Sequence, residues 1–118
     1  MEPIATVIFP TIIWRSTIKC DLDAMSRHIL KYKDLNDGVA LSNYGGWQSK
    51  SFEILDQKPL AIERFIHTLQ RCINECTKMA GMPDLIISDY WWNINYHKDY
   101  NQPHNHRDSM LSGVYYID

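Results

Sequence analysis

The chain has 118 residues, of which 45% are hydrophobic and 22% are charged, and its formal net charge is −2. This length and composition predict one globular domain over residues 1–118, large enough to bury a modest core. Lys and Arg are scattered along the chain, so the sequence indicates neither a nucleic-acid nor a membrane surface as a partner. No apolar stretch is long enough to cross a bilayer, and the N-terminus lacks the basic start of a signal peptide.

The three cysteines, Cys20, Cys72 and Cys76, are odd in number and show no disulfide framework. Cys72 and Cys76 are four residues apart and share one face of an expected helix. A zinc site there would need two further ligands, for which the sequence offers no candidates nearby. We therefore expect buried, reduced thiols, with a metal or redox role as the alternative. Reduced thiols favour a cytoplasmic location.

The expected elements begin with an extended segment over residues 4–14, which is rich in β-branched residues. A helix is predicted over about 22–33, capped by one of the two aspartates at its start. Residues 36–51 are rich in Gly, Asn and Ser, which is typical of a loop. The paired glycines in this loop let the backbone turn sharply and place the indole of Trp47.

A second and longer helix is predicted over residues 59–80, where apolar residues recur at helical spacing and Gly81 ends the pattern. We expect its apolar stripe to cover one face of a sheet. The period then changes to two, which predicts a strand over about 86–96 and another over about 110–117. Strands, a helix, a loop, a helix and more strands, in this order, indicate an α+β fold.

Two histidines, His104 and His106, stand one residue apart in the stretch "NQPHNHRDSM". In a strand such residues point to the same face, roughly 6.5 to 7 Å apart along the chain, so both imidazoles can converge on one metal ion. Imidazole binds Fe, Zn, Cu and Ni alike, so the pair alone does not identify the metal. Two histidines of a polar turn without a metal are the alternative.

Four segments carry a resemblance to a known family: "FP" at 9–10, "SNYGGWQS" at 42–49, "WWN" at 91–93 and "HNHRDSMLSGVYY" at 104–116. In this combination the chain resembles the Fe(II)- and 2-oxoglutarate-dependent oxygenases, and most closely a family of them found in bacteria and their phages. The resemblance extends over almost the whole chain. It places the protein in the cytoplasm of a bacterium or of a phage-infected cell.

The resemblance implies a double-stranded β-helix, or jelly-roll, with the two helices packed on its larger sheet. It implies Fe(II) and 2-oxoglutarate as cofactors and the oxidation of an unknown substrate. By position, His104 is the first metal ligand and His106 the second, with Asp108 as the alternative second ligand. Tyr116 matches a position that hydrogen-bonds the far carboxylate of 2-oxoglutarate, and Tyr96 is a weaker candidate. Packing in the barrel wall is the alternative role of both tyrosines.

The sequence departs from the family pattern after the Tyr-Tyr pair, where relatives have a later histidine ligand and a basic residue that holds 2-oxoglutarate. Arg107 and Lys98 are the bases nearest to the histidines, and neither is expected to reach an enclosed carboxylate. The strands counted here are too few to close an eight-stranded barrel. We therefore expect the N-terminal part of an oxygenase domain, inactive by itself. Its C-terminal strand would be an unpaired edge that favours a homo-oligomer.

Two other functions remain open on the sequence alone. The chain can be a non-catalytic double-stranded β-helix that serves as a binding or structural module of phage origin. It can also be a cupin-like protein whose histidine pair binds another metal.

Overall fold

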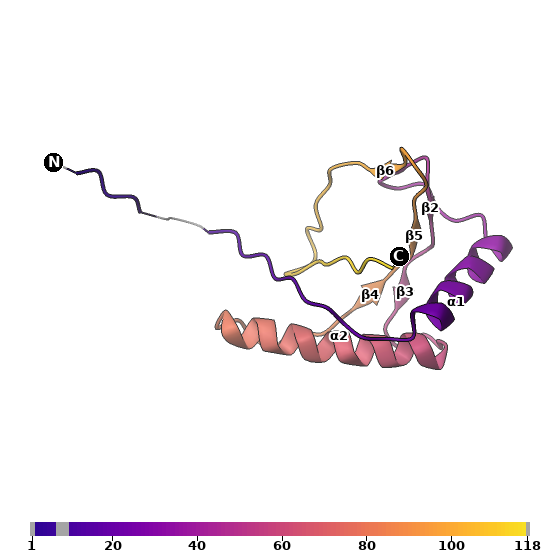
Figure 1. The fold of residues 1–118 in the computed structure, drawn as a ribbon, viewed down its shortest axis with the longest axis horizontal. Helices are drawn as coiled ribbons and strands as arrows, with labels where there is room; N and C mark the ends of the chain where they lie inside the picture. The colour runs from indigo at the N-terminus through magenta and orange to yellow at the C-terminus, as the bar shows by residue number, and fades with distance from the viewer. Residues whose placement is uncertain (1, 7–9, 118) are drawn as a thin grey trace.

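The computed structural model describes residues 2–6 and 10–117, and over these residues the predicted α+β class is confirmed. The elements are α1 (Leu22–Leu35), β1 (Asn43–Tyr44), β2 (Trp47–Gln48), β3 (Phe52–Glu53), α2 (Leu60–Met79), β4 (Asp89–Tyr90), β5 (Asn93–Ile94) and β6 (Tyr100–Asn101). Helix α2 lies along the base of the molecule, α1 stands at one side, and the strands rise above α2 (Figure 1). The first part of the segment before α1 extends away from this body, whereas Ile18 and Cys20 near its end pack into the core (Figure 1).

Both predicted helices are present, and their ends have identifiable causes. At the start of α1 the Asp21 carboxylate accepts a hydrogen bond from the amide of Ala24 at 3.0 Å, which caps the helix. At the end of α2, Gly81 adopts a left-handed φ of 64°. The amide of Met82 then donates to the carbonyl of Thr77 at 2.9 Å, as in a Schellman motif. The glycine that ends the apolar pattern therefore also ends the helix.

Two chain segments, 43–53 and 89–101, form a pair of antiparallel arms. Within them β1 pairs with β6, β2 with β5, and β3 with β4. The prediction of a loop over 36–51 was therefore wrong in part, because this stretch contains β1 and β2. The glycines assist the pairing, since a Cβ atom at Gly46 would lie 2.7 Å from the carbonyl oxygen of Ile94. Glycine here permits a close approach of two strands.

A bulge near Ser49 interrupts the ladder between the arms. Trp47 stands opposite Ile94 and Phe52 opposite Tyr90, so the first arm carries one residue more than the second between these two pairs. The Ser49 hydroxyl lies inside this region and accepts a hydrogen bond from the Trp92 amide at 2.9 Å. A side chain thus supplies an acceptor where the regular ladder is broken.

The bulge turns two aromatic side chains, Trp47 and Phe52, toward α1 although they are five positions apart, a spacing that in a regular strand would put them on opposite faces. The rings of Trp47 and Phe52 lie 6.1 and 5.3 Å from the ring of Tyr32, which belongs to α1. The indole N–H of Trp47 also donates to the carbonyl of Asn36 at 3.0 Å. As expected, the turn places the indole of Trp47. The structure adds that the indole contacts α1 and the residue that follows it.

The predicted strands differ most from the structure. The strand expected over 86–96 is limited to β4 and β5, because the bulge on the opposite arm separates the two ladders. The strand expected over 110–117 is absent, since the backbone of this segment has no ladder partner among the described residues. The segment 4–14 includes residues 7–9, which lie outside the described residues, and its described part contains no assigned strand.

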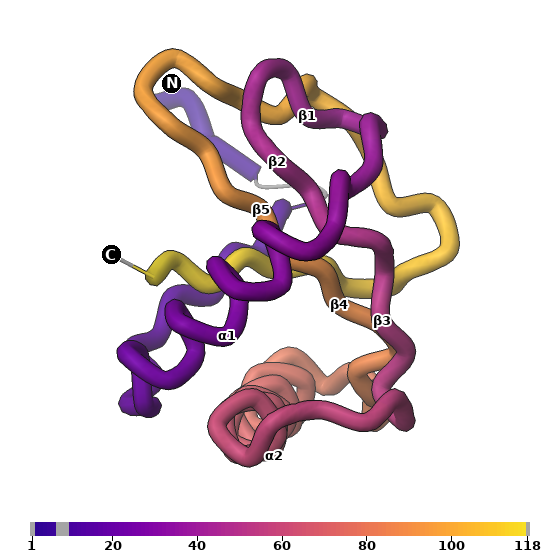
Figure 2. The backbone as a smooth tube through the Cα atoms, turned by 90° about the vertical axis from the view of Figure 1, so that its right-hand side faces the viewer, coloured from indigo at the N-terminus to yellow at the C-terminus, as the bar shows by residue number. Residues whose placement is uncertain are grey.

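The core lies between the helices and the arms. Its buried members are Ile18, Met25, Ile62 and Phe65, and the partly buried residues packed against them are Cys20, Ala61, Ile66, Leu69, Tyr90, Trp92, Tyr115 and Ile117. Seen from the side in Figure 2, α2 runs nearly end-on beneath β3 and β4. The expected apolar stripe of the long helix therefore faces the strands, mainly along its first half.

Tyr115 attaches the C-terminal segment to this core. Its ring packs 4.6 Å from that of Phe65, measured between ring centroids. Its hydroxyl donates to the carbonyl of Ile18 at 2.9 Å and lies 3.2 Å from the thiol of Cys20. The hydrogen bond with Cys20, together with burial, raises the pKa of Tyr115 to about 12. Cys20, Cys72 and Cys76 are free thiols but only half-buried, less than expected.

The variant Ile62→Ala tests the importance of this small core. Ile62 is fully buried, and its truncation is expected to lower the free energy of unfolding by about 2–5 kcal/mol. A loss of that size approaches the whole stability of a small domain. Urea unfolding measures it. As a control, Ile86→Ala removes a side chain that is 83% exposed and should change stability by less than about 0.5 kcal/mol, and equal losses in both variants would contradict this core.

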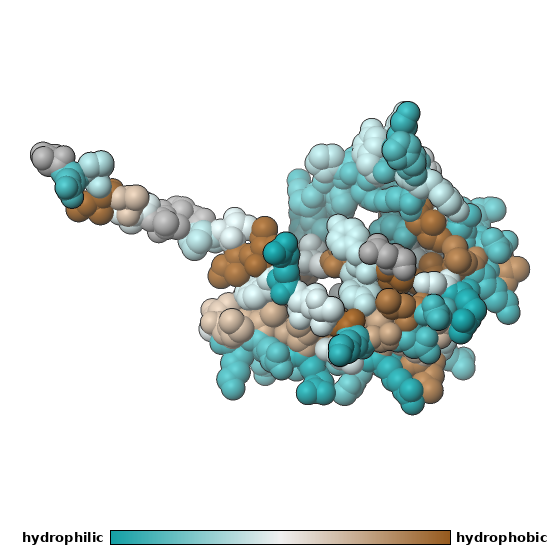
Figure 3. All heavy atoms as spheres, viewed as in Figure 1, coloured by the Kyte–Doolittle hydropathy of each residue, from teal (hydrophilic) through white to brown (hydrophobic). Residues whose placement is uncertain are grey.

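The described residues form an open structure without a closed barrel. The radius of gyration is 17.2 Å, against about 13.5 Å for a compact domain of this length. The accessible surface is 10161 Å², against about 6,700 Å² for a compact protein of this mass. In the space-filling view an opening separates the upper part of the arms from the segment that follows β6 (Figure 3). Within the described ranges, neither helix has the length and apolar character to cross a membrane.

Candidate metal site

The two candidate ligands converge. His104 Nε2 lies 3.1 Å from His106 Nε2, and the ring centroids are 4.7 Å apart with the planes at 77°. The segment that carries them is not a strand, yet both rings reach the same side of it. His104 is exposed and His106 is half-buried. The structure thus brings together the two residues that the sequence singled out.

The hydrogen bonds of His104 determine its tautomer. Nδ1 of His104 lies 2.7 Å from the carbonyl oxygen of Gln102. A carbonyl only accepts, so Nδ1 carries the hydrogen and donates it. In the neutral ring, Nε2 then has a free lone pair, as a metal ligand requires. Without a metal, the 3.1 Å contact is an N–H of His106 donating to this lone pair.

Trp91 lies beside the pair and was not identified as a site residue from the sequence. Its indole is 5.7 Å from the imidazole of His106, with the planes at 35°. The neighbouring side chains Tyr90 and Trp92 pack against the core on the helix side. Because successive side chains of an extended chain alternate, Trp91 points to the opposite face. The sequence could have indicated this orientation, because position 91 lies between two residues expected on the apolar face of a strand.

The two candidate tyrosines are both exposed. Tyr116 is 82% exposed and follows Tyr115, which packs against the core. Tyr96 has Lys33 of α1 over its ring, with Nζ 5.8 Å from the centroid. Tyr96 therefore lies on the α1 side of the arm. Among the described residues, neither tyrosine has a ring contact or a hydrogen bond with His104 or His106.

The alternative ligand Asp108 lies in a turn directly after the pair. The Ser109 amide donates to the His106 carbonyl at 3.1 Å and closes this turn, and Asp108 is exposed within it. Over residues 2–6 and 10–117, no cluster of three or more His, Cys, Asp or Glu side chains is arranged to hold a metal ion. The described site is therefore a two-histidine site with one carboxylate in the adjacent turn.

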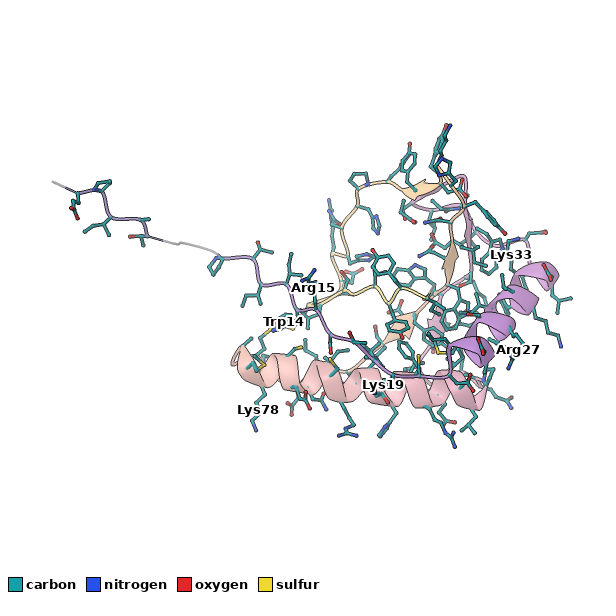
Figure 4. All side chains as sticks on the ribbon, in the orientation of Figure 1. Trp14, Arg15, Lys19, Arg27, Lys33 and Lys78 are labelled. Atoms are coloured by element: carbon teal, nitrogen blue, oxygen red, sulfur yellow. The ribbon has the colours of Figure 1, made fainter. Side chains whose placement is uncertain are left out.

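Two basic residues, Lys98 and Arg107, are near the histidines in sequence, and the other basic residues are spread over the rest of the chain. The basic side chains labelled in Figure 4 belong to the segment before α1 and to the two helices. Arg107 stands in the exposed turn, and Lys98 occupies a turn with a left-handed φ of 72°. Both side chains are exposed, which for Lys98 confirms the expectation from the sequence.

Comparisons of the chain with family models, with curated proteins and with solved structures found no match.

Proposed function

We propose that the chain is part of an Fe(II)- and 2-oxoglutarate-dependent oxygenase that oxidises an unknown substrate, with His104 and His106 as metal ligands. The observation that carries this proposal is the 3.1 Å separation of the two Nε2 atoms. Imidazole nitrogens lie about 2.1 Å from a bound transition metal, so two of them in neighbouring octahedral positions are about 3.0 Å apart. The pair therefore has the spacing of two adjacent ligands of one metal ion.

Each residue has a definite task in this proposal. The iron, when bound, supplies the oxidative chemistry. His104 offers Nε2 to the metal because its Nδ1–H donates to the Gln102 carbonyl. In the metal-free pair, Nε2 of His106 carries the hydrogen that it donates to His104. His106 offers Nε2 to the metal once this hydrogen has left it or moved to Nδ1. Tyr116 is proposed to hydrogen-bond the far carboxylate of 2-oxoglutarate. The two arms are proposed to form part of a double-stranded β-helix.

A non-catalytic module with the same fold is the second candidate. Its support is that the described residues contain no third ligand clustered with the pair. A binding or structural protein needs no complete metal centre. For either candidate we propose a cytoplasmic location, because all three cysteines are free thiols. The oxygenase would have a small-molecule cosubstrate as its first partner.

An anaerobic titration distinguishes the two candidates. Fe(II) is added to the chain, followed by 2-oxoglutarate, and the visible absorption is recorded. A 2-oxo acid that chelates protein-bound Fe(II) gives a charge-transfer band, whereas succinate, which lacks the oxo group, gives none and is the matched control. The oxygenase proposal expects the band with 2-oxoglutarate alone, and weakly, since two histidines leave most metal positions to water.

Two other outcomes of the titration would count against the oxygenase proposal. Metal binding without the band would favour a metal-binding module that has no cosubstrate. Failure to bind Fe(II) at any concentration tested would contradict the oxygenase proposal for this chain.

A further inference from the structure

The indole of Trp91 is the side chain packed beside His106. The 5.7 Å separation and the 35° angle between the planes describe two rings in offset, tilted contact. Trp91 is half-buried, and its neighbours Tyr90 and Trp92 face the core. The contact therefore does not belong to the core packing that holds the arms to the helices.

His106 needs such a contact because its backbone does little to orient its ring. The Gln102 amide still donates to the Ser42 carbonyl at 2.7 Å, but over 103–106 the only backbone hydrogen bond among the described residues is that of the turn in which Ser109 donates to His106. The terminal torsion of a histidine side chain is broad. His104 has its own orienting bond, from Nδ1 to the Gln102 carbonyl. No corresponding hydrogen bond to a carbonyl or carboxylate orients the His106 ring among the described residues.

We propose that Trp91 is the positioning residue of the histidine pair: its indole restricts rotation of the His106 imidazole and holds Nε2 beside that of His104. This inference rests on the proposed metal site and deepens it. Second-layer groups around metal-bound histidines change metal affinity by about 10- to 100-fold when removed. Here an aromatic ring would orient the histidine by packing against it, whereas in other sites a carboxylate or a carbonyl orients the histidine by a hydrogen bond.

The test compares three variants of the full chain by Zn²⁺ titration calorimetry. Trp91→Ala should weaken Zn²⁺ binding by about tenfold. Trp91→Phe keeps an aromatic face and should stay close to wild type. Tyr44→Leu is the control, because it removes another ring contact of the arms, the Tyr44–Tyr100 stack at 4.9 Å, from β1 and not from the segment that carries the histidines. Equal affinities for Trp91→Ala and wild type would overturn the positioning role.

A second measurement separates this inference from the metal site itself. Imidazole nitrogen signals in the NMR spectrum of the metal-free chain report ring tautomer and motion. Trp91→Ala should change the His106 signals and leave those of His67 unchanged, and unaltered His106 signals would overturn the proposal even if Zn²⁺ affinity fell. If wild type binds no Zn²⁺ while the His106 signals still depend on Trp91, the contact is real but positions no metal ligand. That result would refute the metal site and the inference together.

Discussion

The double variant His104→Ala, His106→Ala is expected to lose measurable Co²⁺ binding, and each single variant to weaken it by at least about 100-fold. A metal held by two adjacent imidazoles 3.1 Å apart loses its chelate when either one is removed. A single exposed histidine is a weak ligand, because water competes for every other position. Calorimetric titration at neutral pH, with circular dichroism to confirm folding, measures the effect.

His67→Ala provides the matched control. His67 is exposed on α2, so His67→Ala shows whether the loss of any surface histidine outside the pair changes metal binding. Its metal affinity should equal that of wild type. If the double variant bound Co²⁺ as tightly as wild type, the histidine assignment would be wrong. Unchanged affinity in His106→Ala with a large loss in Asp108→Ala would instead assign the second ligand to Asp108.

The helices were predictable because their signals are local. Apolar spacing, an aspartate before α1 and Gly81 after α2 act within one or two turns of chain, and the structure has both helices close to the expected bounds. The convergence of His104 and His106 was also foreseeable, because an extended chain places alternate residues on one side whether or not it joins a sheet.

The bulge and the tryptophan contact were not predictable from local pattern. The register shift near Ser49 exists only because two distant arms pair, and it decides that Trp47 and Phe52 face the same helix. Trp91 contacts His106 across fifteen positions of sequence. Such contacts depend on tertiary arrangement, and alternation indicates only the face that a residue occupies.

The strand expected over 110–117 illustrates a different limit. Its composition favours a strand, but a strand exists only when its backbone has a partner. Among the described residues this backbone has none, although Tyr115 attaches the segment to the core. The sequence can therefore indicate the tendency to form a strand, but it does not identify the backbone segment with which that strand would pair.

The second large effect is self-association of the chain. We expect dimers or larger assemblies at micromolar concentration. The backbone of the segment 110–117 has no ladder partner among the described residues, and it carries exposed apolar side chains such as Val114, which is 75% exposed. The accessible surface, which includes that of the extended segment before α1, exceeds that of a compact protein of this mass by about 3,500 Å². A stable interface needs only about 800 Å² from each partner. Sedimentation over a range of concentrations measures the assembly.

Two variants distinguish pairing at the backbone edge from burial of the apolar face. Ser112→Pro removes one amide donor and adds no charge, so it should weaken association only if a second copy pairs with this edge. Val114→Lys places a charge on the segment and should weaken association in either case. Leu55→Lys is the control, since Leu55 is 92% exposed in the loop between β3 and α2. A monomer at every concentration, with one sharp thermal transition, would contradict the prediction, because the open surface would then be stable in water without a partner.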